Sequence, residues 1–305
     1  PWGGSSPFVV QLKRYLERRG YTVCFDLRKK VDVIVLIDPR DDLQLKSFGM
    51  DEIRAYKKIN PKVKVLHRIN ECDQRKNSSF MDELLKNANE IADHTVFIAN
   101  WLQDYHSERW FNKDNSHSVI YNGADPNVFH PIGSAIYDDK EAFRIVSHHW
   151  SDNMLKGFDI YSKIDQAIER GQLEGVELWI VGRWPSEIKW NETRLFPPSQ
   201  GKKLADTLRS CHAYVTASRW EPCGMHHVEG AQCGLPLLYH MDGGGIVEAG
   251  ERYGLGFGDD DFIDAIKSLR DEYGKYRNLV LNNSPCGDRM VIEYTNRIQS
   301  LIASN

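Results

Sequence analysis

Apolar residues in the first part of the chain recur with two spacings, one typical of helices and one typical of buried strands. The stretch SPFVVQLKRYLERRG has helical spacing and ends at Gly20, and residues 51–59 have the same spacing. SSFMDELLKNANEIAD has the pattern of a capped amphipathic helix. The short apolar runs between these helices predict strands in YTVCFDL, VDVIVLID, KVKVLHRI, HTVFIA and SHSVIYNG, the last ending in an Asn-Gly turn.

This alternation lapses and then starts again. From Pro126 to Asp139 the chain has prolines, Gly133 and no periodicity, and we predict a linker over residues 131–143. Beyond the linker, the pattern predicts strands in FRIVSHH, VELWIVG, AYVTAS and PLLYHM. It predicts helices in GFDIYSKIDQAIERG and GKKLADTLRSC, near residues 260–270 and near residues 288–303.

Strands that are apolar throughout and alternate with helices predict parallel sheets covered by helices on both faces. Two such series joined by a linker predict an α/β protein with two Rossmann-like domains facing one another, residues 1–130 and residues 144–287. A C-terminal helix over residues 288–305 is expected to pack back on the first domain. The chain begins with PWGGSSPF, a glycine-rich turn that leads directly into a helix. A doubly wound domain normally has a strand before such a turn, so we expect that this first strand is missing upstream.

Composition and charge limit the kinds of protein that this chain can be. Its 305 residues suffice for two domains, and 41% hydrophobic with 27% charged residues is normal for a globular protein. The net charge of −4 gives no electrostatic reason to expect nucleic acid. It also argues against adhesion to anionic lipid by overall charge, although a local basic patch leaves a peripheral membrane contact open. The longest apolar runs are strand-length, far too short to span a bilayer, and no signal peptide is visible.

Cysteine and histidine spacing gives no metal site. The six cysteines form no C-x-x-C pair, which indicates reduced thiols and a cytoplasmic protein. The adjacent histidines His148 and His149 lie on a predicted strand, where neighbouring side chains point to opposite faces and rarely share one ion. The acidic run GDDDF has the pattern of a loop before a helix, with Asp261 as the N-cap. We therefore expect no bound metal.

The stretch EPCGMHHVEGAQCGLP, from Glu221 to Pro236, carries the most suggestive chemistry. It follows the predicted strand AYVTAS, and Gly224 gives backbone freedom just before a helix that begins near Met225 or His226. Ligands of open α/β sheets bind at the carboxyl ends of strands, and helix N-termini bind phosphate. Glu221 then lies in the loop, and Glu229 lies about one turn into the helix, within reach of a ribose hydroxyl. On spacing alone, a solvated Glu221 and a helix-surface Glu229 are the favoured alternative, because two glutamates in sixteen residues are common.

Several motifs, in order, resemble those of one enzyme family. SRWEPCGMHHVEGAQCGLPLL resembles the E-x7-E motif of retaining glycosyltransferases with the GT-B fold, especially glycosyltransferase family four, also called glycosyl transferases group 1. GGSSPFVVQLKRYLERRGYTV, VIYNGADPNVFHP, LKGFDIY, LWIVGRWP and DGGGIVEAG resemble the family's glycine loop, interdomain segment, donor loop, donor-domain strand and G-G-x-x-E loop. The resemblance covers nearly the whole chain, and the combination is specific although no single piece is.

The resemblance implies a role for each matching residue. Lys156 matches the lysine at the donor diphosphate, where a cation stabilises the leaving group. Glu221 matches the glutamate at the donor sugar, and Glu229 matches the one that binds ribose. His67, at the end of a predicted strand, matches a histidine near the donor sugar and acceptor. The alternative is a histidine whose hydrogen bonds fix the loop. The backbone that approaches the donor is expected to be that of Gly224, Met225, His226, Gly243, Gly244 and Gly245, and in the first domain that of Gly3 and Gly4. Asn70 and Asp73 are expected to contact the acceptor, with weaker support for Trp101.

One departure from the family concerns the phosphates. The family pairs its lysine with an arginine after the first strand of the second domain, but this chain has His148 and His149 there. Either a histidine such as His148 contacts the phosphates, which makes donor binding sensitive to pH, or Arg183 compensates.

The resemblance implies a retaining glycosyltransferase of the hexosyltransferase type, acting in carbohydrate biosynthesis. It moves a sugar from a UDP- or GDP-linked donor to an acceptor hydroxyl, with no metal and no other cofactor. In the expected mechanism, the acceptor attacks on the face that the diphosphate leaves, and the protein contributes positioning and charge. The acceptor is a glycan, a lipid-linked sugar or a small molecule. Two alternatives stay open, a nucleotide-sugar epimerase of the same fold and a non-catalytic binding protein. A nicotinamide dehydrogenase is excluded because no G-x-G-x-x-G follows a strand.

Overall fold

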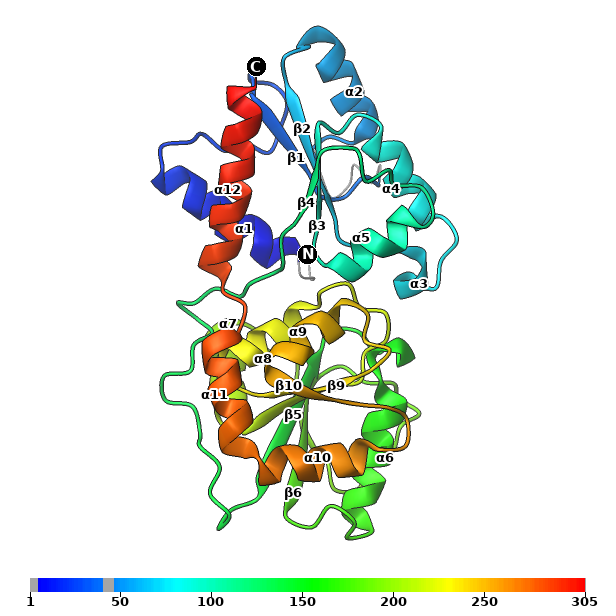
Figure 1. Cartoon of the computed structure of the whole chain (residues 1–305), viewed down its shortest axis with the longest axis vertical. Helices are drawn as coiled ribbons and strands as arrows, with labels where there is room; N and C mark the ends of the chain where they lie inside the picture. The colour runs from blue at the N-terminus through cyan, green and yellow to red at the C-terminus, as the bar shows by residue number, and fades with distance from the viewer. Residues whose placement is uncertain (1–4, 41–46, 305) are drawn as a thin grey trace. The chain divides into compact units, whose positions relative to one another are not determined.

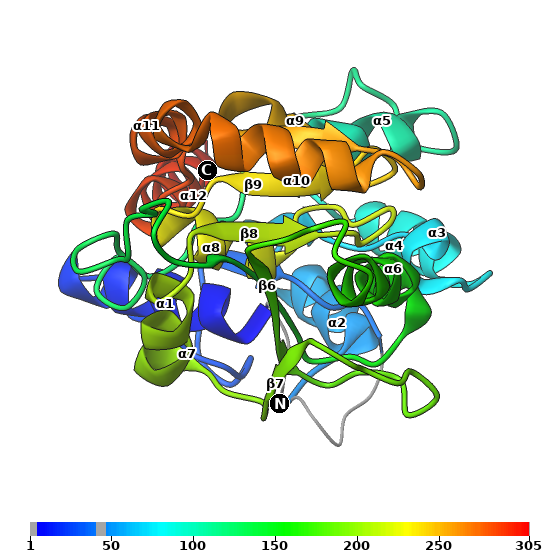
Figure 2. The same ribbon diagram turned by 90° about the horizontal axis from the view of Figure 1, so that it is seen from below.

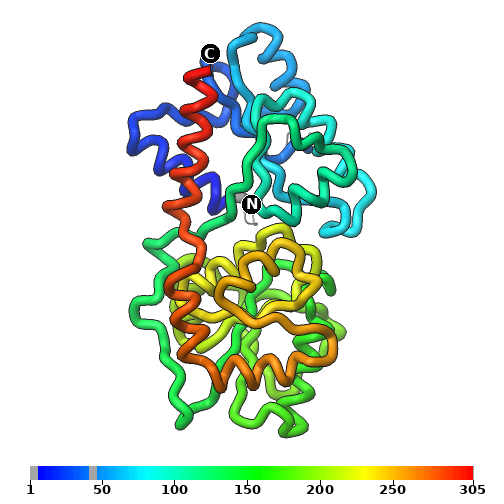
Figure 3. Tube along the Cα trace, viewed as in Figure 1, coloured from blue at the N-terminus to red at the C-terminus, as the bar shows by residue number. Residues whose placement is uncertain are grey.

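The computed structural model describes residues 5–40 and 47–304, which fold into two compact units. The first unit consists of Ser5–Tyr121 and the C-terminal segment from Arg289, and the second consists of Asn122–Asp288. In Figure 3 the chain can be followed from the first unit into the second and back into the first along its red C-terminal helix. Each unit has its own parallel sheet.

The first unit is built on a four-stranded parallel sheet with strand order β1-β2-β3-β4. The strands are β1 (Val33–Leu36), β2 (Lys64–Ile69), β3 (His94–Phe97) and β4 (His117–Val119). The helices, shown in Figure 1, are α1 (Ser5–Arg18), α2 (Met50–Ile59), α3 (Asp73–Lys76), α4 (Met81–Asn89), α5 (Asn100–Ser107) and α12 (Gly287–Ala303).

Two apolar clusters lie in the first unit. In one, α1 packs with α12 and the strands, and the rings of Phe8 and Tyr294 lie 4.8 Å apart, edge to face. In the other, Met50 and Ile53 of α2 pack on alternate residues of β1 and β2. Because side chains alternate along a strand, the two clusters cover opposite faces of the sheet. This is the arrangement of a Rossmann-like unit, and its last helix is provided by the end of the chain.

The second unit is built on a six-stranded parallel sheet with order β10-β9-β8-β5-β6-β7. Its strands are β5 (Phe143–His149), β6 (Val176–Gly182), β7 (Arg194–Phe196), β8 (Ala213–Thr216), β9 (Leu237–His240) and β10 (Gly254–Phe257). Its helices are η1 (Met154–Lys156), α6 (Phe158–Glu169), α7 (Gly201–Arg209), α8 (Met225–Gln232), α9 (Gly245–Tyr253), α10 (Phe262–Asp271) and α11 (Tyr273–Asn283).

The order of these strands fixes where a ligand can bind. On one side of β5 lie β6 and then β7, and on the other side lie β8, β9 and β10 in that order. The order therefore reverses between β5 and β8, the kind of switch point outside which open α/β sheets bind ligands. Helices α6 and α10 share one apolar core with the sheet, and Figure 2 shows α10 alongside β9.

Most of the predicted elements are confirmed, with some exceptions. YTVCFDL was predicted to be a strand and is not one. Its first four residues have no regular structure, and from Phe25 the chain forms bends in which the Asp26 carboxylate accepts the N–H of Arg28, 3.0 Å away. β7, β10, α3, α9, α11 and the short helix η1 were not predicted. β10 has the sequence GLGF, whose glycines have the pattern of a turn, and α9 begins within a glycine run. Asp261 precedes α10, but its side chain makes no capping bond to that helix.

Candidate functional site

The predicted donor residues of the second unit meet at the carboxyl ends of β5 and β8. The centre of this group is an ion pair in which Lys156 Nζ donates to Glu221 Oε2 at 2.8 Å. Each side chain keeps only 12% exposure, so the pair is partly withdrawn from water. The two residues are 65 positions apart in the sequence, and the fold brings them into contact.

A glycine turn holds Lys156 in place. Lys156 ends η1, and Gly157 follows with φ of 88°, a left-handed conformation that favours glycine. A Cβ on Gly157 would lie 2.3 Å from the Cβ of Ala217, in the segment after β8. Only glycine therefore allows the Lys156 segment to approach the Glu221 segment this closely.

The Glu221 loop is fixed by the predicted glycine loop. The N–H of Trp220 donates to Asp242 O at 2.8 Å, and that of Glu221 donates to Gly243 O at 3.1 Å. Gly244 has φ of 66° and bridges to Glu221. Gly245 then begins α9. The backbones of the two loops thus lie together, as a donor site built from both requires.

Glu229 is held by His148. His148 Nε2 lies 2.9 Å from Glu229 Oε2, and its Nδ1 lies 3.1 Å from the hydroxyl of Tyr214. Because a carboxylate only accepts hydrogen bonds, Nε2 donates to Glu229. His148 therefore orients the glutamate that was assigned to ribose. Tyr214 was not predicted, and its position in the middle of an apolar strand gave no signal of this role.

Arg183 follows β6 directly, and its backbone N–H donates to His149 O at 2.9 Å. Its side chain is exposed. His149 points elsewhere, with Nε2 3.0 Å from both Ser147 Oγ and the Tyr161 hydroxyl, inside the unit. Of the candidates for the role of the family arginine, Arg183 is thus the one with an exposed cationic side chain.

Gly224 precedes α8, but not for the predicted reason. Its φ of −64° is open to any residue. A Cβ there would instead lie 2.4 Å from the ring of His226, so the position needs glycine for space. His226 Nε2 lies 3.0 Å from Thr216 Oγ1. Burial and the nearby Lys156 charge hold the pKa of His226 well below its ordinary value, so the ring is neutral. Met225 is the first residue of α8.

In the first unit, His67 is fully buried within β2, as the fourth of its six residues and not at its end. Its Nδ1 lies 2.9 Å from Asn89 Oδ1, and because an amide oxygen only accepts, Nδ1 carries the proton. Its Nε2 is buried and has no hydrogen-bond partner among the described residues. Burial lowers the pKa of His67 to about 4, outweighing the hydrogen bond to Asn89.

Asp73 has a structural task. Although burial alone would raise its pKa, hydrogen bonds from Ser78 and from three backbone N–H groups lower it. Those N–H groups belong to Phe80, Met81 and Asp82, at the start of α4, so Asp73 caps that helix. Asn70 lies half-buried just after β2, and Trp101 packs against Tyr105 in α5 at 5.7 Å between ring centroids. Gly3 and Gly4 lie outside the described residues.

The family comparison matches the part of the chain that carries this site. Residues 149–272 match the family described as Glycosyl transferases group 1. This part of the chain is therefore similar to the group 1 glycosyltransferases. The match confirms the resemblance that the motifs indicated. The comparison with curated proteins found no match.

Solved structures show the fold of the whole chain. Sucrose-phosphate synthase from Thermosynechococcus elongatus is 16% identical, with a TM-score of 0.66 over 98% of this chain and 78% of that one. Alr3699/HepE from Anabaena, in complex with UDP-glucose, is 15% identical, with a TM-score of 0.64 over 90% and 79%. The catalytic domain of Starch Synthase IV from Arabidopsis thaliana, bound to ADP and acarbose, is 12% identical, with a TM-score of 0.62 over 99% and 79%. The predicted fold, an α/β protein of GT-B type with two Rossmann-like domains, is confirmed.

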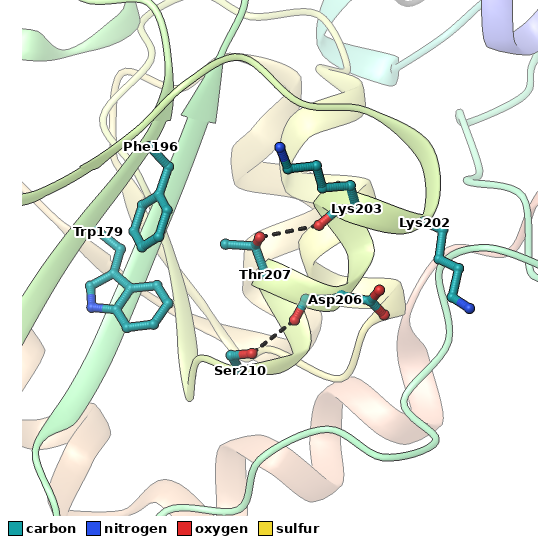
Figure 4. Close-up of a pocket in the computed structure, with 7 residues that line it drawn as sticks. All are labelled: Trp179, Phe196, Lys202, Lys203, Asp206, Thr207 and Ser210. Carbon is teal, nitrogen blue, oxygen red and sulfur yellow. Dashed lines mark hydrogen bonds between the residues drawn. The ribbon is translucent and has the colours of Figure 1, made fainter.

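Other features of the chain lie apart from the predicted donor residues. A pocket of about 540 Å³ between β6, β7 and α7 is lined by Trp179, Phe196, Lys202, Lys203, Asp206, Thr207 and Ser210 (Figure 4), none of which was predicted for the site. Within the described ranges, no three His, Cys, Asp or Glu side chains are grouped to hold a metal ion. No helix in that part of the chain is long and apolar enough to cross a bilayer.

Proposed function

We propose that the protein is a retaining hexosyltransferase of the group 1 type, transferring a sugar from a nucleoside-diphosphate donor to an acceptor hydroxyl. One observation carries the proposal. The Lys156–Glu221 pair and the His148–Glu229 pair lie together at the switch point of the second sheet. A cation, a carboxylate for sugar hydroxyls and an oriented carboxylate for ribose are what a nucleotide sugar requires.

Each residue has a defined task in this proposal. Lys156 stabilises the negative charge that develops on the departing diphosphate, together with the N–H groups at the start of α8. Glu229, fixed by His148, accepts hydrogen bonds from the ribose hydroxyls. Glu221 accepts hydrogen bonds from hydroxyls of the transferred sugar. The acceptor oxygen attacks the anomeric carbon on the face that the diphosphate leaves, and a diphosphate oxygen takes its proton. Retention of configuration follows.

The donor is proposed to be UDP-linked, with GDP-linked sugars as the second choice. UDP-glucose is bound by the Anabaena protein of the same fold, whereas the Arabidopsis enzyme binds ADP, so the fold alone does not select the base. The acceptor is a glycan, a lipid-linked sugar or a small molecule, contacted on the first unit by Asn70. Asp73 and His67 then support the surrounding structure. The enzyme is proposed to act in the cytoplasm, without metal.

The test is a screen of UDP-, GDP- and ADP-sugars with mono- and oligosaccharide acceptors. The expected result is release of the nucleoside diphosphate that depends on acceptor, with NMR of the product showing the donor's anomeric configuration. An inverted product would refute the retaining mechanism. Conversion of the nucleotide sugar without any acceptor would instead identify an epimerase, and binding without turnover would identify a non-catalytic protein.

A further inference from the structure

Arg219 lies two residues before Glu221, and its guanidinium joins two carboxylates of the second unit. Nη1 and Nη2 donate to the two oxygens of Asp159 at 3.0 and 2.9 Å, and Nη2 also donates to Asp259 Oδ1 at 2.8 Å. The same oxygen of Asp259 lies 3.0 Å from His240 Nε2. The Arg219 side chain is 15% exposed. Its charge is therefore committed to two carboxylates and is not available to a diphosphate.

Arg219 is tied to the Lys156 segment twice. Its backbone N–H donates to the carbonyl of Leu155, the residue before Lys156, at 2.9 Å. Its side chain holds Asp159, which lies in the first turn of α6 immediately after the Lys156 turn. A planar guanidinium that binds both oxygens of one carboxylate fixes direction as well as distance. The position of Lys156 relative to residue 219 is thus set from both sides.

The residue between Arg219 and Glu221 needs such support. Trp220 has φ of 53°, in the left-handed region that a bulky side chain rarely adopts. Such a conformation is strained and persists only where the surroundings enforce it. Arg219 anchors the segment before the strained residue, and the N–H bonds of Trp220 and Glu221 to the glycine loop anchor it after. This strained turn immediately precedes Glu221, whose carboxylate meets Lys156.

We propose that Arg219 is a positioning residue that holds Glu221 and Lys156 in the geometry needed for sugar transfer, without touching the substrate. The inference rests on the proposed function, since the geometry matters only if these two residues act on a nucleotide sugar. Asp159 is its main partner. Asp259 and His240 extend the same connection to the ends of β10 and β9.

The experiment compares Arg219→Lys and Asp159→Asn with the wild type, with Arg194→Lys as a control. Arg194 is a solvent-exposed arginine on the edge strand of the same unit, 3.9 Å from Glu177. Arg219→Lys keeps the charge and loses the two-pronged contact. We expect kcat to fall roughly tenfold to a hundredfold, as small misplacements of reacting groups do. The KM for donor and the Kd for UDP are expected to stay within about twofold. The kcat of the double variant should be no lower than that of the less active single variant, because both substitutions remove the same Arg219–Asp159 contact.

A second measurement does not depend on activity. Amide hydrogen exchange at Trp220 and Glu221 should speed up in Arg219→Lys while the amides of β6 keep their protection. Faster exchange throughout the unit would show a general stabilising role and overturn the proposal, as would unchanged exchange at Trp220 and Glu221. A Kd for UDP raised as much as in Lys156→Ala would show that Arg219 binds phosphate, which also overturns it. If the wild type transfers no sugar, the proposed function fails, and the exchange data still decide whether Arg219 positions the loop.

Discussion

Replacing Glu221 by Gln should change catalysis and nucleotide binding in opposite directions. Lys156 is paired with Glu221 at 2.8 Å, so a diphosphate that binds Lys156 must compete with that carboxylate for the ammonium group. The Gln variant removes the competitor and keeps the size of the side chain. Nucleoside diphosphate should therefore bind the variant at least as tightly as the wild type, whereas sugar transfer should slow.

The size of each effect follows from the structure. Exposed ion pairs contribute about 0.2–1 kcal/mol, and with 12% exposure on each side this pair is taken at the upper end, about 1 kcal/mol. Release of that energy raises affinity for the diphosphate up to about fivefold. Contacts of Glu221 with the transferred sugar act in the transition state and not in binding of the bare nucleotide. Their loss should lower kcat by about tenfold or more, roughly 1.4 kcal/mol in barrier height.

Titration calorimetry with UDP and initial rates at saturating donor measure the two effects. Glu187→Gln, at an exposed glutamate of the same unit, is the control and should change neither. Glu229→Gln is the contrast and should weaken UDP binding. Lower UDP affinity in Glu221→Gln together with full turnover would refute the division of roles between the two glutamates.

Three further outcomes are expected. Gly224→Ala should lower both Tm and UDP affinity, because its Cβ would lie 2.4 Å from the His226 ring, whereas Gly274→Ala, in open space within α11, should leave both unchanged or raise Tm. Transfer should survive EDTA, and loss of activity restored by manganese would refute the metal-free mechanism. The free energy of unfolding should fall as the pH drops from about 7 toward 4. Buried His67, with its pKa lowered to about 4, binds fewer protons in the folded than in the unfolded protein over this range. The contribution of His67 to this slope approaches about 1.4 kcal/mol per pH unit. His67→Gln should make the measured slope of unfolding free energy against pH shallower by that share, and an unchanged slope would show that His67 is not buried neutral.

The sequence predicted the local parts of the site better than their contacts. A strand, a loop and a helix that begins near Met225 or His226 follow from periodicity and from the position of Gly224, and the structure has them, with the helix beginning at Met225. The contacts of Glu221 and Glu229 span 65 and 81 positions, and no local pattern encodes which partners they meet. The two histidines of FRIVSHH show this limit clearly, since only the folded sheet decides which of them faces Glu229.

For a related reason, the sequence did not reveal which residue caps α4. A helix is usually capped by the residue at its start, whereas α4 is capped by Asp73, which lies eight positions before Met81. In the sequence, a carboxylate in a loop after a strand resembles an acceptor ligand as much as a distant cap. The spacing also concealed why Gly224 is glycine, because the limiting contact is with a side chain two residues later and not with its own backbone.

The charge of the donor site bears on which residue replaces the family arginine. Lys156, Glu221 and Glu229 together carry a formal charge of −1, and a nucleoside diphosphate adds further negative charge. His148 brings no phosphate contact of its own in this arrangement, because its Nε2–H is directed at Glu229. His226 is held neutral by burial. The remaining candidate is Arg183, which directly follows β6, the strand paired with β5. Its guanidinium is exposed and makes no hydrogen bond or ion pair within the described part of the chain. We therefore propose that Arg183 provides the second cation for a diphosphate at the switch point, and a phosphate-bound histidine becomes the less favoured alternative.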